Sequence, residues 1–334
     1  MGYKKKTPAN TLQLGTEVLA GASETESLSD RIARYSGGRS RALEMLDYLD
    51  ELPVIEYQTR YGTRTRNPSP PQVRSGLRNC ANYLHFHEYY TIDKIRLASA
   101  QFCKQHLICP LCAMRRGTKS LNSYLERFKI IKAAQPHLKL CMLTFTVQNG
   151  ECLEERFKHL TGTLKKLMQR RNNYNKGVRG AKYSELCKVQ GGVYSIETTN
   201  IGNGWHPHLH MLCLVDANVV QHDLRNEWHG LSGDSFMVDV SPIKGDPVDG
   251  FMEVFKYAVK FSDLTLEQNW HAAQILKGKR LLNAFGLFRG VEVPEELTDE
   301  LLEDLPYWDR FYRFAFGHYQ ITGERPPQQP PADA

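Results

Sequence analysis

Apolar and polar positions change their period several times between residues 112 and 264, which predicts alternating helices and strands. The segment 151–173 has apolar residues at helical spacing. The segment 206–215 continues as unbroken apolar sequence after its first residues, as a buried strand does. Its neighbour in sequence, 200–204, contains two glycines and is typical of a hairpin loop. We expect strands over 138–148, 192–199 and 206–215, and helices over 112–134, 151–173 and 249–264.

This order of elements predicts an α+β fold with a central antiparallel sheet and helices on one of its faces, rather than a doubly wound parallel sheet. The chain ends carry weaker patterns. One helix is expected over 40–52, and the segment 60–74, rich in Arg, Thr and Pro, is typical of a linker. We expect a largely flexible or accessory segment 1–72, a zinc-binding module with its following helix 73–135, a core 136–270, an accessory region 271–322 and a disordered, proline-rich tail 323–334.

The net charge of +6 and the pI of about 8.8 indicate a mild preference for polyanions. No segment approaches the roughly 20 apolar residues of a membrane span, and no apolar signal core follows the basic N-terminus. We therefore expect a cytoplasmic protein without membrane contact.

One stretch of the chain, 156–190, holds ten Lys or Arg residues against a single acid, with Tyr174 and Tyr183 among them. It is either a solvated helix face followed by a loop, or a surface for phosphates and bases. The candidates for DNA contact are Arg170, Arg171, Lys176, Arg179 and Lys256.

Four of the eight cysteines suggest a metal site, because a disulfide scaffold is not expected without a secretory signal. Cys109 and Cys112 stand in a Cys-Pro-x-Cys knuckle, and Cys103 lies six positions before Cys109. Either Cys80 or His106 completes a tetrahedral Zn²⁺ site. The alternative is a set of unligated thiols or a redox pair.

Three histidines at alternate positions, His206, His208 and His210, point to the same face of the strand predicted over 206–215. Neutral imidazoles at this spacing suit a divalent metal ion. Two alternatives are histidines that are only hydrogen-bonded and a histidine-triad nucleotide hydrolase. Pro207 and the length of the chain disfavour the hydrolase.

The predicted helix from residue 249 carries one polar stripe, formed by Glu253, Lys256, Tyr257 and Lys260. An interfacial tyrosine is usually packing, but neighbouring ammonium groups favour a phenolate that can attack phosphorus, and Lys260 can also hold the phosphate. With a metal ion on the histidine strand, Tyr257 would cut a phosphodiester and remain attached as a 5′-phosphotyrosine. Glu253 would later activate a water or a hydroxyl for release.

In combination these motifs resemble an HUH endonuclease, and more narrowly the single-tyrosine replication initiators of rolling-circle plasmids. The resemblance covers roughly residues 75–265. The matching pieces are Phe102-Cys103 through Cys109-Pro110-Leu111-Cys112, the run Leu143–Val147, the run Trp205–His210 with His208-Leu209-His210 as the HUH pair, and Glu253-x3-Tyr257-x2-Lys260.

The resemblance implies an HUH fold and an origin-nicking enzyme that uses Mg²⁺ or Mn²⁺. It implies Glu253 as the terminating base and a third metal ligand from a neighbouring strand, for which Glu197 is the candidate and His206 the alternative. It also implies as partners the plasmid double-strand origin, single-stranded DNA, a host helicase and a single-strand-binding protein. A dimer is one oligomeric state that the sequence leaves open.

Two other functions stay open from the sequence. A rolling-circle HUH transposase would typically carry a tyrosine pair, whereas the position four before Tyr257 is Glu253. A non-catalytic, zinc-containing origin-binding protein would have no need of the Glu-Tyr-Lys stripe.

Overall fold

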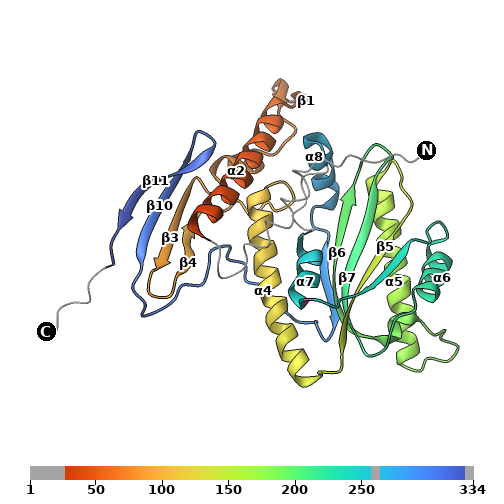
Figure 1. Cartoon of the computed structure of the whole chain (residues 1–334). Coiled ribbons are helices and arrows are strands. Elements are labelled where there is room, and N and C mark those ends of the chain that lie inside the picture. Colours follow the sequence, from red (N-terminus) through yellow and green to blue (C-terminus); the bar gives the residue numbers. More distant parts are fainter. Residues whose placement is uncertain (1–26, 257–263, 328–334) are drawn as a thin grey trace, which may run out of the picture. The chain divides into compact units, whose positions relative to one another are not determined.

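The computed structural model describes residues 27–256 and 264–327 (Figure 1). The described residues divide into two compact units. The central unit comprises Gly117–Val293, and the flanking unit comprises the residues up to Arg116 together with those from Pro294 onward. The expected segments 73–135 and 271–322 are thus each divided between the units.

A five-stranded antiparallel sheet forms the middle of the central unit, in the order β8-β5-β7-β6-β9. The strands expected over 138–148, 192–199 and 206–215 are present as three adjacent members of this sheet. The strands are β5 Lys139–Thr146, β6 Val189–Thr199, β7 His206–Val215, β8 Val238–Pro242 and β9 Leu282–Gly286.

Helices cover both faces of this sheet, so the expectation of helices on one face is wrong (Figure 1). Phe145 of β5 contacts Trp228 of α6, and the same face receives α5. The opposite face receives α7, where Gly250 lies so close to Leu212 of β7 that an added Cβ would come within 3.1 Å of its side chain. Both faces of β7 are apolar beyond the histidines, and each therefore needs a covering layer. The helices are α5 Leu153–Asn175, α6 Gln221–Ser232, α7 Pro247–Lys256 and α8 Leu266–Leu276, with the short 3-10 helix Glu185–Lys188.

The helices α5 and α7 form where the apolar spacing predicts them. The apolar stripe of α5, from Leu153 to Leu167, is buried. In α7, Phe251 and Phe255 are buried and contact Phe128 and Tyr124 of α4, which spans Pro110–Ala134. The helix predicted over 249–264 is confirmed as far as Lys256, and the rest of it lies outside the described residues.

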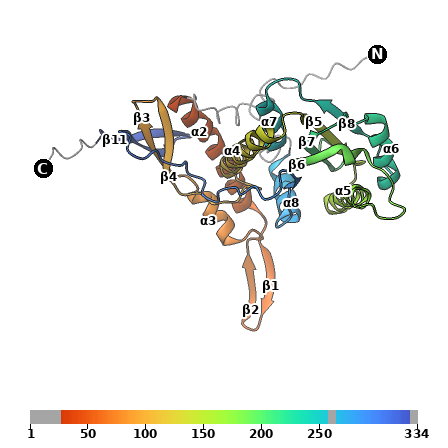
Figure 2. The same ribbon diagram turned by 90° about the horizontal axis from the view of Figure 1, so that it is seen from below.

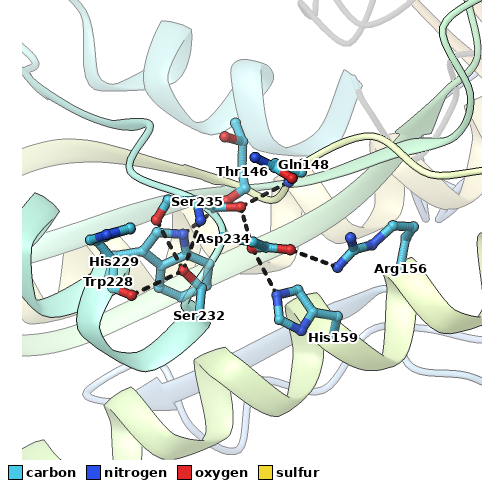
Figure 3. Close-up of polar contacts among 9 residues, drawn as sticks. All are labelled: Thr146, Gln148, Arg156, His159, Trp228, His229, Ser232, Asp234 and Ser235. Atoms are coloured by element: carbon cyan, nitrogen blue, oxygen red, sulfur yellow. Dashed lines mark hydrogen bonds and ion pairs between the residues drawn. The ribbon is translucent and has the colours of Figure 1, made fainter.

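A polar network centred on Asp234 ties α5 to the end of β5 (Figure 3). Arg156 and His159 of α5 contact its two carboxylate oxygens at 3.0 and 2.9 Å. Ser235 donates to Asp234 and accepts from the backbone N–H of Gln148, just beyond β5. Burial alone would raise the pKa of Asp234, but these donors outweigh it and lower the pKa. The network therefore holds the strand end that pairs with His208.

The flanking unit contains a four-stranded antiparallel sheet in the order β11-β10-β3-β4. Two of its strands, β10 and β11, come from the C-terminal part of the chain, and β10 pairs along β3. Residues of the expected accessory region 271–322 therefore take part in this sheet. The elements are α2 Leu28–Glu51, β1 Ile55–Thr59, β2 Gly62–Arg66, α3 Pro71–Asn79, β3 Tyr83–Tyr89, β4 Lys94–Ala100, β10 Trp308–Ala315 and β11 His318–Arg325.

The first part of the flanking unit is more regular than its sequence suggests. The helix expected over 40–52 begins at Leu28 instead, and Gly38 inside it lies against the first turn of α4, where a larger side chain would meet Leu111 and Met114. The segment 60–74, interpreted as a linker, contains β2 of the β1–β2 hairpin and the start of α3 (Figure 2). The two hairpin strands are almost fully exposed, and β2 contains no large apolar residue, so a buried face does not mark the hairpin in the sequence.

No helix within 27–256 or 264–327 combines the length and the apolarity that a membrane span requires.

One largely buried carboxylate, Asp299, joins its own segment to three helices and strands of the flanking unit. It contacts Arg31 of α2 and Arg115 of α4, and it accepts a hydrogen bond from the backbone N–H of Leu97 in β4. Burial alone would raise the pKa of Asp299, but the two guanidinium groups and the N–H donor hold it well below its usual range.

We expect Asp299→Asn to lower the free energy of unfolding by about 2 to 4 kcal/mol, because it leaves the buried guanidinium of Arg115 and the largely buried one of Arg31 without their counter-charge. Urea unfolding curves measure the change, and Glu303→Gln, at an exposed position of the same segment, is the control. Because folding depresses this pKa, the contribution should be fully present above about pH 4 and decline as the pH falls further. Equal unfolding midpoints for the two variants would contradict the assignment.

Candidate metal centres and catalytic site

The thiols of Cys80, Cys103, Cys109 and Cys112 lie together in the flanking unit, with all four sulfur atoms within 4.8 Å of one another. Cys80 follows α3 directly, Cys103 lies in the loop after β4, and Cys109 and Cys112 lie at the start of α4. The positive end of the α4 dipole favours thiolates there. Hydrogen bonds from the other three cysteines, Cys103 first, lower the pKa of Cys80, whereas contacts within the cluster and burial raise the pKa values of Cys109 and Cys112.

This cysteine cluster fits a zinc ion. A tetrahedral site with Zn–S bonds of about 2.3 Å has neighbouring sulfur atoms about 3.8 Å apart. In the structure, the Sγ atoms of Cys80 lie 3.7 Å from Cys109 and 3.5 Å from Cys112, and Cys103 lies 3.5 Å from Cys112. The cluster can therefore accept the ion with small movements of its side chains.

Of the two candidates for the fourth ligand, the structure brings Cys80 into the cluster and leaves His106 outside it. The imidazole of His106 is exposed, and its Nδ1 lies 3.4 Å from the carbonyl oxygen of Lys104.

A second group with metal-ligand chemistry lies on the α7-facing side of the central sheet, formed by Glu197, His208 and His210. The β6–β7 pairing places Glu197 directly opposite His208. Glu197 Oε2 lies 3.0 Å from His208 Nε2 and 3.9 Å from His210 Nε2. All three residues are largely buried, so a two-histidine, one-carboxylate set is held on rigid backbone.

The contacts of this group fit a cation between its members. His208 Nδ1 lies 3.3 Å from the carbonyl oxygen of His206, which can only accept, so the Nδ1 proton is the donor. In a neutral ring this leaves the Nε2 lone pair pointing at the carboxylate of Glu197. Two acceptors 3.0 Å apart require a proton or a metal ion between them.

Two neighbouring residues support this group. Thr144 of β5 contacts His210 Nδ1 at 3.2 Å and so orients its ring, a role that the sequence analysis missed because it depends on the β5–β7 register. His206 is not a member of the ligand group. Its ring stacks on His208, and burial lowers its pKa.

Residues 94–307 match the model of a family described as replication protein. The match covers more than half of the chain and includes Glu197, His208, His210 and Tyr257. The chain belongs to the replication protein family. This membership confirms the resemblance to rolling-circle plasmid initiators, and it makes the protein a plasmid replication initiator in general terms. No curated protein and no solved structure matches the chain significantly.

Of the polar stripe expected in this replication protein, the structure describes only part. Glu253 lies in the last turn of α7, on the helix that covers the histidine face of the sheet. Lys256 ends the described helix, and its side chain is not described. Tyr257 and Lys260 lie outside the described residues.

The basic residues expected to contact DNA have different surroundings. Arg171 of the replication protein donates to the carbonyl oxygens of Leu186 and Val189, and Arg170 donates to that of Tyr183. These bonds fasten the segment after α5 to the helix. Lys176 and Arg179 are exposed beyond the end of α5. For all four residues, contact with DNA remains a prediction.

We expect Cys109→Ser to remove the zinc that a thiol-specific mercurial releases from the purified replication protein, because serine is a poor zinc ligand. His106→Gln should release as much zinc as the unaltered protein. A chromogenic zinc chelator measures the release. Zinc loss in His106→Gln, or its retention in Cys109→Ser, would exclude the four-cysteine site.

Proposed function

We propose that the protein starts rolling-circle replication by nicking one strand of its plasmid origin and remaining attached through a 5′-phosphotyrosine at Tyr257. The observation that carries this proposal is the Glu197–His208–His210 group on the sheet face covered by α7. The helix α7 leads directly into Tyr257. The proposed nucleophile therefore follows, in sequence, a helix that covers the sheet face carrying the metal-ligand set.

Glu197, His208 and His210 would hold the divalent ion, which polarises a phosphodiester and stabilises its negative charge when bound. Two imidazoles and one carboxylate suit Mn²⁺ or Mg²⁺ in this role, with Mn²⁺ the better match to imidazole. Thr144 would keep the His210 ring in its ligating orientation.

In the cleavage step, Tyr257 Oη would attack phosphorus in line and lose its proton to a neighbouring base or to water. The bond from phosphorus to the 3′ oxygen breaks, and that oxygen takes up a proton to become a free 3′-hydroxyl. Lys256 and Lys260 would favour the phenolate and neutralise charge on the phosphate. Glu253, four residues earlier on the helix, would later activate a water or a hydroxyl to release the DNA.

The partners of the initiator would be DNA and two host proteins. The exposed Lys176 and Arg179 would contact phosphates of the origin or of single-stranded DNA. A host helicase and a single-strand-binding protein would act on the strand that the nick frees.

We expect Tyr257→Phe to abolish both the nicking of supercoiled origin plasmid and the covalent adduct with a labelled origin oligonucleotide in Mn²⁺. The substitution removes the attacking oxygen and little else. Tyr90→Phe, at an exposed turn of the flanking unit, is the matched control and should nick at the unaltered rate.

The same assay separates the alternatives. Origin binding by the unaltered protein without any nick would favour the non-catalytic origin-binding protein. An adduct that persists in Tyr257→Phe would place the nucleophile elsewhere and contradict the proposal.

We expect Glu253→Ala to nick at close to the unaltered rate but to accumulate the covalent adduct at least tenfold, because release lacks its base. Pulse-chase gels of adduct against time measure this. The control is Glu267→Ala, in the first turn of α8. Loss of nicking in Glu253→Ala would make Glu253 a metal ligand or a structural residue instead.

A further inference from the structure

A third group with metal-ligand chemistry lies in the flanking unit, on the paired strands β3 and β10. We propose that His85, His87 and Asp309 bind a divalent transition-metal ion of the Zn²⁺ class. Asp309 Oδ1 lies 2.6 Å from His85 Nε2 and 3.5 Å from His87 Nε2. The three ligand atoms all lie within 4.8 Å of one another.

The backbone arrangement repeats that of the site in the central sheet. His85 and His87 are two apart on β3 and share a face of the strand. The pairing of β10 with β3 places Asp309 directly opposite His87, as the pairing of β6 with β7 places Glu197 opposite His208. In each sheet a His-x-His strand meets one carboxylate from its antiparallel neighbour. Two imidazoles and a carboxylate, with one position left for water, match the ligand set of Zn²⁺ sites.

Ring stacking holds both imidazoles in place. His87 lies against Tyr307, with ring centroids 3.7 Å apart and planes 8° from parallel, and His85 lies against Phe311 at 4.5 Å and 13°. Nδ1 of His87 is also 3.4 Å from the hydroxyl of Tyr89. Side chains that are already ordered lose little conformational freedom when they bind an ion.

The charges around the group are compatible with a cation. Arg310 lies on the other face of β10 and is paired with Glu88 and Glu324. Arg96 of β4 stands opposite His87, and its like charge should lower the affinity of the site without removing a ligand. His85 and Asp309 are the more exposed members, with side chains 26% and 16% accessible, so an ion can enter from solvent.

The ion would join distant parts of the chain, because His85 and Asp309 are 224 positions apart. Neither histidine nor Asp309 lies within the residues matched by the family model. The site would therefore belong to the flanking unit and lie outside the segment that the family model matches.

The test uses the full-length protein, saturated with Zn²⁺ and dialysed against metal-free buffer. Metal analysis by mass spectrometry should find one zinc ion fewer per chain in Asp309→Asn and in His87→Gln than in the unaltered protein. His318→Gln, at an exposed position of β11 in the same sheet, should lose none. Circular dichroism confirms that each variant is folded, and mercurial release confirms that the cysteine zinc is retained.

A second measurement needs no variant. Crystals grown with Zn²⁺ should give an anomalous difference peak at the zinc edge between His85 Nε2, His87 Nε2 and Asp309 Oδ1. The absence of a peak there, or equal zinc content in Asp309→Asn and the unaltered protein, overturns the proposal. The contact of His85 with Asp309 is then an ion pair only.

Discussion

The pairing register of β6 with β7 is the constraint on which the candidate catalytic site depends. It sets Glu197 opposite His208 and Ser195 opposite His210. Because side chains alternate between faces, a slip of one residue would move Glu197 to the α5 side and leave the histidines without a carboxylate. The register is protected because β7 lies third of five strands and is paired on both edges. The Asp234 network holds β5, and β5 in turn supplies Thr144 to His210.

The sequence predicted the central unit well because its patterns are local. The helix over 151–173 carries apolar residues at helical spacing, and the strand over 206–215 is an apolar run directly after a hairpin loop with two glycines. Glu197 could be named as a candidate ligand because the resemblance implies a third ligand on a neighbouring strand and the predicted hairpin places this residue across from the histidines. The covering of both sheet faces was missed, since the apolar side of α7 does not reveal which face of the sheet it meets.

The flanking unit was harder to predict because its structure depends on distant contacts. The hairpin β1–β2 is exposed, and α2 contains two adjacent glycines that read as helix breakers. Cys80 could be named but not chosen over His106, since the choice depends on where α3 ends relative to α4. No local pattern could pair Asp309 with His87 or place Asp299 between two arginines, because each partner comes from the other end of the chain.

The division of the flanking sheet between the two chain ends has a consequence for synthesis. Strands β3 and β4 leave the ribosome about 220 residues before β10, with the whole central unit between them. At ordinary elongation rates this delay is on the order of ten to forty seconds. Throughout that interval the edge of β3 is unpaired and open to association with other nascent chains. The central sheet, by contrast, has all its strands once residue 286 has emerged. The initiator is thus a protein whose central unit can fold during translation while its flanking unit must wait for β10 and β11.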